Sequence, residues 1–111
     1  MDTKCNGWSN YPTWNWKLWM DNSLNDWDER TQEIYENAEP DKYFTKKEAA
    51  TRELESQLKL ECDEYYNEFV SPNIGNYGAF TDIFGWALEQ IDFYEIAENM
   101  LSDRKEDLEK D

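Results

Sequence analysis

The sequence predicts an all-α protein, a compact bundle of four to five helices with an aromatic-rich core. Apolar residues recur every three or four positions through most of the chain, which is the period of one helical face. Six Trp, seven Tyr and five Phe provide large side chains for a core. Turn-forming residues are sparse, with four Gly and three Pro, and no low-complexity linker divides the chain.

A single domain is expected over residues 1–111, because this length is usual for one folding unit. Residues 1–12 contain Gly7 and Pro12 and are predicted to be irregular. The last residues, 103–111, are nearly all charged and are expected to fray. Acidity alone would favour disorder, but the aromatic content favours a folded domain.

The first predicted helix, 14–21, has an ambiguous pattern. Its even-numbered positions are all apolar, as on a half-buried strand, whereas Trp16, Trp19 and Met20 fall at helical spacing. We favour a helix with Thr13 as its N-cap, because no second strand is evident that could pair with this segment.

A second helix is predicted at 23–38, with Asn22 or Ser23 as its N-cap and Pro40 beyond its end. Its apolar residues follow a three–four spacing and are expected to face the core. They are Leu24, Trp27, Thr31, Ile34, Tyr35 and Ala38.

The longest predicted helix, 46–70, opens with a capping box formed by Thr45 and Glu48. A segment dense in turn residues, 71–78, follows this helix and is predicted to be a loop. The core stripe of the long helix comprises Ala50, Leu54, Leu58, Cys62, Tyr65 and Phe69.

Two further helices close the chain. The first, 79–90, contains Gly85, which costs about 1 kcal/mol relative to Ala and indicates a close contact with another helix. Asp92 and Glu95 match a capping box that starts the last helix. The inward residues are expected to be Phe80, Ile83, Phe84, Ala87, Leu88 and Ile91 on the first helix, and Phe93, Ile96, Ala97, Met100 and Leu101 on the last.

The net charge is the most informative property of the chain. Twenty-six Asp and Glu oppose eleven Lys and Arg, which gives a formal charge of −15 at pH 7. Small soluble domains need only ~2–8 charges, and so large an excess destabilises the compact state by self-repulsion. A strongly basic partner would offset this cost, and nucleic-acid-binding proteins carry such surfaces. A solvated acidic face without any partner is the alternative.

The carboxylates form rows on two predicted helices. A spacing of three and four residues places each row on one face, where like charges repel one another. At 1.5 Å per residue the first row spans roughly 15 Å, enough to imitate a few phosphates, which repeat every ~3.4 Å along a DNA strand. The predicted partner-binding carboxylates are Asp26, Glu29, Glu33 and Glu36 on the first helix and Glu61, Glu64 and Glu68 on the second.

Five of the six Trp lie between residues 8 and 27. Core packing is the simpler interpretation of this cluster. The alternative is an exposed aromatic patch, with Trp16 and Trp19 as partner-binding residues, that contacts another protein or a second copy of the chain in a homodimer. Direct stacking on nucleic acid is disfavoured by the negative charge.

The sequence offers no support for catalysis. It has no His and no spacing typical of a zinc protease, a CxxC redox pair, a serine hydrolase or a P-loop. We therefore expect a protein that is not an enzyme, with no catalytic residue, cofactor or metal site.

The compartment is expected to be the cytoplasm. Cys5 and Cys62 allow one disulfide, but two free thiols in a reducing compartment are favoured. No apolar run of ~18–20 residues and no signal-peptide pattern occurs. Anionic lipid headgroups would repel the chain, so membrane binding is not expected.

Two segments carry a resemblance to a known family. Residues 11–22 read Tyr-Pro-Thr-Trp-Asn-Trp-Lys-Leu-Trp-Met-Asp-Asn, and residues 92–97 read Asp-Phe-Tyr-Glu-Ile-Ala. Together with the apolar helix at 80–88, they resemble a family of small acidic phage and plasmid proteins with a Tyr-x-Thr-Trp-Asn-x-x-Leu-Trp-x-x-Asn opening. The resemblance implies an origin in a mobile element, and it does not by itself specify an activity.

These observations lead to one expected function and one alternative. Small acidic phage proteins often mimic DNA, and by this analogy we expect a non-catalytic anti-CRISPR or anti-restriction inhibitor in the host cytoplasm. Its acidic helix faces would block the DNA channel of a CRISPR effector or a restriction enzyme. The alternative is a protein–protein adaptor or regulator of a phage or plasmid that acts through the Trp-rich N-terminal surface.

Overall fold

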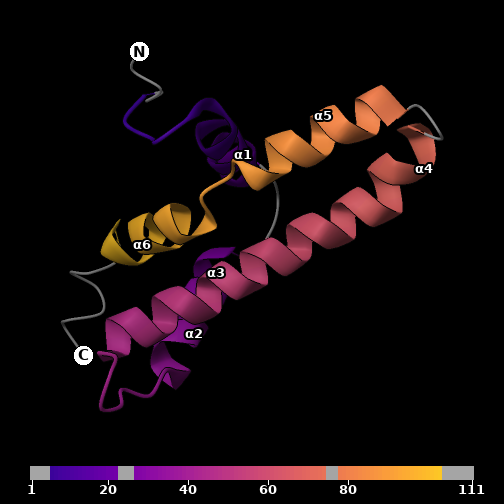
Figure 1. Cartoon of the computed structure of the whole chain (residues 1–111). Coiled ribbons are helices and arrows are strands. Elements are labelled where there is room, and N and C mark those ends of the chain that lie inside the picture. The colour runs from indigo at the N-terminus through magenta and orange to yellow at the C-terminus, as the bar shows by residue number, and fades with distance from the viewer. Residues whose placement is uncertain (1–5, 23–26, 75–77, 104–111) are drawn as a thin grey trace.

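The computed structural model describes residues 6–22, 27–74 and 78–103, which are largely helical (Figure 1). The elements are α1 (Tyr11–Asn22), α2 (Trp27–Asn37), α3 (Lys46–Tyr65), the π-helix η1 (Tyr66–Val70), α4 (Ser71–Ile74), α5 (Gly78–Glu89) and α6 (Phe93–Asp103). The described residues contain no β-strand, so the all-α prediction is confirmed. The segment at 14–21 is helical, as favoured, and Ser23, Leu24 and Asp26 lie outside the described residues.

Helix α1 begins at Tyr11, so Tyr11 and Pro12 are helical and not irregular as predicted, and residues 1–5 lie outside the described residues. Asn10 caps the helix, because its Oδ1 atom accepts a hydrogen bond from the backbone N–H of Thr13 at 2.9 Å. The prediction of Thr13 as the N-cap is therefore wrong. Thr13 is instead fully buried, one turn inside the helix boundary.

The buried Thr13 hydroxyl joins α1 to the turn between α5 and α6. Its Oγ1 atom accepts from the backbone N–H of Asp92 at 2.9 Å and donates to the carbonyl of Gln90 at 3.4 Å. The side-chain amide of Asn10 donates to the same carbonyl at 2.7 Å. We call these four residues the N-terminal clamp. It brings together the two segments, near residues 11 and 92, that carry the family resemblance.

Asp92 caps α6 as predicted, because its Oδ1 atom accepts from the backbone N–H of Glu95 at 3.0 Å. In the expected capping box the Glu95 carboxylate would accept from the backbone N–H of Asp92, but it has other partners. The carboxylate of Glu95 accepts from the backbone N–H and the hydroxyl of Ser9, at 3.2 and 2.8 Å. The start of α6 is thus fixed by side chains and backbone from the other end of the chain.

Helix α3 begins with the predicted capping box. Thr45 Oγ1 accepts from the N–H of Glu48 at 3.1 Å, and Glu48 Oε1 accepts from the N–H of Thr45 at 3.2 Å. The α-helix ends at Tyr65, before the predicted residue 70. Two short helices follow it, η1 and then α4. Helix α4 occupies residues 71–74, where a loop was predicted. Pro72 has no N–H to donate and its ring clashes with a regular turn before it, which accounts for the wider turns of η1.

The core forms where α2 and α6 pack on α3, between Ala50 and Cys62. Among the described residues Trp27 and Phe93 are its buried aromatics, and Trp8, Trp16 and Tyr35 are partly buried against it. Its buried members are Met20, Trp27, Ile34, Ala50, Leu54, Leu58, Cys62, Phe93, Ile96, Ala97, Met100 and Leu101. Most of the buried core side chains are therefore not aromatic, although the sequence contains many more aromatic residues than the core uses.

The apolar stripe of α5 is not buried, in contrast to the prediction. Ile83 is 61% exposed and Phe84 is 43% exposed, and on η1 and the end of α3 Phe69 and Tyr65 are each 54% exposed. The reason is length: the 20 residues of α3 extend about 30 Å, whereas the 11 residues of α6 cover only about 16 Å. Figure 1 shows α4 and α5 at the end of α3 that α6 does not reach.

Two other observations agree that the molecule is extended at the end that contains α4 and α5. The radius of gyration is 15.8 Å, compared with about 13 Å for a compact domain of this length. A Cβ atom added at Gly85 would meet nothing within 4 Å, so the close helix contact predicted there is absent. The bundle is therefore compact around α3 as far as Cys62 and open beyond it.

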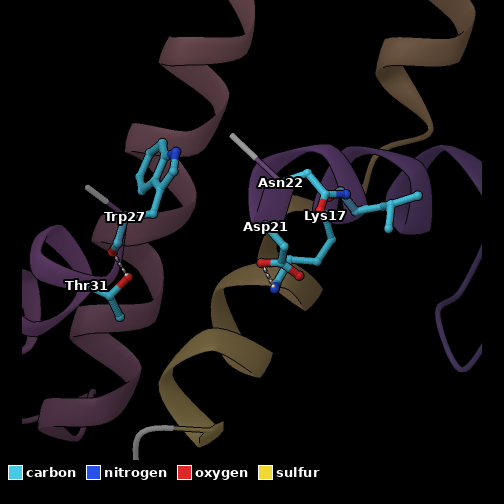
Figure 2. Close-up of polar contacts among 6 residues, drawn as sticks. Lys17, Asp21, Asn22, Trp27 and Thr31 are labelled. Atoms are coloured by element: carbon cyan, nitrogen blue, oxygen red, sulfur yellow. Dashed lines mark hydrogen bonds and ion pairs between the residues drawn. The ribbon is translucent and has the colours of Figure 1, made fainter. Parts of the chain in front are cut away.

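Other buried threonines make local hydrogen bonds. Figure 2 shows the Thr31 hydroxyl donating to the carbonyl of Trp27 at 2.7 Å, one turn earlier in α2. Thr51 makes the same kind of bond to Lys47 at 2.7 Å. The ion pair of Lys17 with Asp21, at 2.6 Å, is also local (Figure 2). Thr13 differs because its hydroxyl bonds to a distant part of the chain.

Replacing Thr13 by Val should destabilise the fold by about 1–3 kcal/mol, because the N–H of Asp92 would lose its buried acceptor. The matched control is Thr51→Val, which removes an equally buried hydroxyl from a carbonyl that keeps its helical N–H partner. Urea denaturation followed by circular dichroism measures both. Equal losses of stability in the two variants would contradict the role of the clamp.

Candidate protein-binding surfaces

Helix α2 presents a row of carboxylates to solvent. Glu29, Glu33 and Glu36 are exposed, and their spacing of four and three residues places them opposite the buried Trp27 and Ile34. We call these three carboxylates the α2 ridge. The salt bridges within the described residues join Lys17 to Asp21, Arg30 to Glu61 and Lys59 to Glu55, so none involves the ridge. Asp26, also predicted for this row, lies outside the described residues.

Glu61 differs from its predicted role, because a cation of its own chain holds it. Arg30 donates to Glu61 Oε2 at 2.9 Å and to Gln57 Oε1 at 3.1 Å, and its guanidinium lies 3.8 Å from the centre of the Trp27 ring. This contact joins α2 to α3. The structure therefore removes Glu61 from the set of freely available carboxylates.

Glu64 and Glu68 are both exposed, as the second predicted row requires. Glu64 lies in the last turn of α3, but Glu68 belongs to η1. The wider turns of a π-helix move Glu68 out of the three–four register that the sequence predicts. The second row is therefore shorter and less regular than the α2 ridge.

A groove of about 580 Å³ runs between α2 and α3. Three of its lining residues are carboxylates, Glu33, Glu39 and Glu53, and its one lining cation, Arg30, already pairs with Glu61. The complete lining is Arg30, Glu33, Ile34, Asn37, Ala38, Glu39, Ala49, Glu53 and Gln57. The groove thus extends the negative surface of the ridge onto α3.

Sequence reasoning missed Glu39 and Glu53. Glu53 stands next to Arg52 in the sequence, which suggests that its charge is compensated locally. In the structure the Arg52 guanidinium lies 4.7 Å from the centre of the Phe44 ring instead. No local pattern reveals this arrangement, because it depends on how the chain before α3 folds over that helix.

The two candidate tryptophans of α1 have different environments. Trp16 packs edge-on against Phe93, with ring centres 5.9 Å apart, and is partly buried against the core. Trp19 is 66% exposed and lies on the same helix as the exposed Tyr11. Of the predicted pair, Trp19 is therefore the side chain that a partner can reach.

Cys62 is a buried free thiol. Burial, together with the charge of the neighbouring Asp63, raises its pKa from 9.0 to about 11. The thiol is therefore protonated at neutral pH and is a poor nucleophile. Cys5 lies outside the described residues.

The described residues hold no group of three or more His, Cys, Asp or Glu that could bind a metal ion. No helix in this part of the chain is both long and apolar enough to cross a bilayer.

Comparison with known proteins identifies a family. Residues 1–108 match the profile named "Family of unknown function (DUF7249)". The chain belongs to the DUF7249 family. The match includes the N-terminal clamp, the α2 ridge and α5, so all three are features of the DUF7249 part of the chain. Neither the curated proteins nor the solved structures contain a significant match.

The raised pKa of Cys62 predicts a loss of stability in alkali. The folded pKa, about 11, exceeds the ordinary 9.0, so the thiol stabilises the fold fully below pH 9 and loses this effect between pH 9 and 11. Cys62→Ala lacks the titrating group and serves as the reference for all other groups. Urea denaturation from pH 8 to 10.5 should show the stability of the native protein falling more steeply than that of Cys62→Ala. Parallel pH profiles would contradict the prediction.

Proposed function

We propose that this DUF7249 protein is a non-catalytic inhibitor that mimics the charge of DNA and blocks the DNA channel of a host defence nuclease. The observation that carries the proposal is the α2 ridge, whose three carboxylates are exposed and lie in none of the salt bridges among the described residues. Lysine and arginine side chains that normally contact phosphates would pair with this ridge. The target class is a CRISPR effector or a restriction enzyme.

The groove beside the ridge supports the same proposal. Glu39 and Glu53 add negative charge next to Glu33, so a basic side chain entering the groove would meet carboxylates from both α2 and α3. Each exposed ion pair contributes only ~0–1 kcal/mol, so affinity must come from many pairs. The net charge of −15 would also accelerate encounter with a basic channel.

The resemblance to small acidic phage and plasmid proteins implies a mobile element, and the analogy with acidic phage inhibitors places the proposed action against host defence in the host cytoplasm. The part of the resembling segment that includes Thr13 has a structural task, since it forms the N-terminal clamp. The presence of Thr13 in this segment is therefore explained by its part in the clamp and requires no role in partner binding. In this proposal the contact with the nuclease is made by α2 and α3.

The exposure of Trp19 favours one alternative, a protein–protein adaptor or regulator of a phage or plasmid. Trp19 and Tyr11 are both exposed on α1, and Trp is common at the energetic centres of interfaces. A partner bound there would make mainly apolar contacts. Its affinity would change little with salt, in contrast to that of a basic channel.

Neutralising the α2 ridge tests the proposal. The variant Glu29→Gln/Glu33→Gln/Glu36→Gln should weaken inhibition of DNA cleavage roughly 10- to 100-fold, at up to ~1 kcal/mol for each lost pair. The control Asp82→Asn/Glu89→Gln/Glu98→Gln removes the same charge from exposed positions on α5 and α6 and should change inhibition less than ~3-fold. Cleavage assays use a panel of purified CRISPR effectors and restriction enzymes at ~50 and ~300 mM salt.

Inhibition should also weaken steeply at the higher salt concentration, because counterions compete with the carboxylates. Equal effects of the two triple variants, or no inhibition of any nuclease in the panel, would contradict the proposal. The adaptor alternative predicts a different result. In that case Trp19→Ala abolishes partner binding at both salt concentrations, while the ridge variant binds normally.

A further inference from the structure

The core-facing stripe of α3 continues beyond the part that the other helices cover. Its buried members end at Cys62, which is 3% exposed. Tyr65 and Phe69 follow at intervals of three and four residues, so they continue the same face. Both are 54% exposed, and α6 does not reach this end of α3 (Figure 1). We call these two residues the open end of the α3 stripe.

Helix α5 borders the open end on one side. The rings of Tyr65 and Phe69 have their centres 5.4 Å apart and form one aromatic surface. Tyr66 is the next residue along the chain, and successive residues of a helix differ in direction by about a quarter of a turn. Its ring lies 6.5 Å from that of Phe84 in α5. Helix α5 therefore lies beside the open end without enclosing it.

Carboxylates border the open end on the other side. Glu64 and Glu68 each precede one of the two rings by one residue, so they lie about a quarter of a turn from the rings, on the side opposite to Tyr66. Both are exposed, and neither takes part in a salt bridge among the described residues. A segment lying on the open end would thus have α5 on one side and carboxylates on the other.

The surroundings of the open end carry charge of one sign only. No Lys or Arg occurs between Lys59 and Arg104, so every charged side chain between these two residues is a carboxylate. Charge complementarity therefore favours a basic occupant. A second copy of the chain, with its own charge of −15, would be repelled, as would a nucleic acid or an anionic lipid.

The first half of the chain shows how its aromatic rings are used with cations. The guanidinium groups of Arg30 and Arg52 lie 3.8 and 4.7 Å from the ring centres of Trp27 and Phe44. All cation–π contacts among the described residues involve rings no later in the chain than Phe44. The rings of the open end have no Lys or Arg in their own segment, so basic side chains of a partner can supply the cations.

The area of the open end limits the size of its occupant. A half-exposed ring leaves roughly 100 Å² uncovered, so Tyr65, Phe69 and the 43% exposed Phe84 together expose about 300 Å². A standard interface between two folded proteins buries ~800 Å² on each partner. The open end therefore suits a single peptide segment and not a whole folded domain.

We propose that the open end of the α3 stripe binds an apolar segment rich in Arg and Lys that belongs to a protein partner. The apolar side chains of this segment pack on Tyr65 and Phe69. Its cations pair with Glu64 and Glu68 and lie over the ring faces. The surface is separate from the α2 ridge, so the inference goes beyond the proposed function and the two can fail independently.

Titration of the full chain with a labelled amphipathic peptide of ~18 residues, made of Leu and Arg, tests the proposal. The peptide should bind in the micromolar range at ~150 mM salt, and the same peptide with Glu in place of Arg should not bind. Tyr65→Ala/Phe69→Ala should weaken binding at least ~10-fold, because the apolar contact surface is lost. The control Tyr11→Ala/Trp19→Ala removes two exposed rings from α1 and should change binding less than ~3-fold.

A second pair of variants separates this site from a general attraction to an acidic protein. Glu64→Gln/Glu68→Gln should weaken binding of the Leu–Arg peptide roughly 3- to 10-fold, because two ion pairs are lost. The matched control Glu29→Gln/Glu33→Gln removes the same charge from the α2 ridge and should leave the affinity within about 2-fold of the native value.

Hydrogen exchange of the native protein gives a further readout that needs no substitution. The Leu–Arg peptide should slow exchange at the end of α3 and in η1 and leave α2 unchanged. Failure of this peptide to bind, binding of the Leu–Glu peptide, or equal losses of affinity in either variant and its control would overturn the proposal. So would protection confined to α2. Protection of the open end by a raised protein concentration alone would also overturn it, because the occupant would then be a second copy.

Discussion

The buried hydroxyl of Thr13 is the contact on which the arrangement of the helices depends. It accepts from the N–H of Asp92, the N-cap of α6, and donates to the carbonyl of Gln90, just after α5. It therefore fixes where α5 ends and α6 begins. The start of α1 is thereby joined to the turn between α5 and α6. An unpaired donor or acceptor at this buried position would be costly, so the clamp specifies one geometry.

The few cations of the described chain hold the fold together and leave the ridge uncompensated. The guanidinium groups of Arg30 and Arg52 lie over the rings of Trp27 and Phe44, and the ammonium of Lys46 lies 5.1 Å from the centre of the Tyr35 ring. Cation–π contacts of this kind contribute ~0.5–1 kcal/mol at exposed sites. They help to offset the self-repulsion of an acidic chain while its carboxylates remain available to solvent.

The molecule separates two kinds of surface onto different helices. The α2 ridge is acidic and exposed, whereas α5 exposes the apolar side chains of Ile83 and Trp86. Both surfaces lie outside the core, which α2, α6, Met20 of α1 and α3 as far as Cys62 form.

The sequence alone determined most of the helices, the Thr45–Glu48 capping box, the Asp92 cap, the core stripe of α6 and that of α3 as far as Cys62, because periodicity and capping are short-range effects. It also placed the α2 ridge on one face. Only the tertiary structure decided that Thr13 is a buried link, that Glu61 is held by Arg30 and that α5 is exposed. The sequence pattern of an apolar or charged stripe is the same whether or not another part of the molecule covers it. Helix lengths and packing decide whether the stripe is covered.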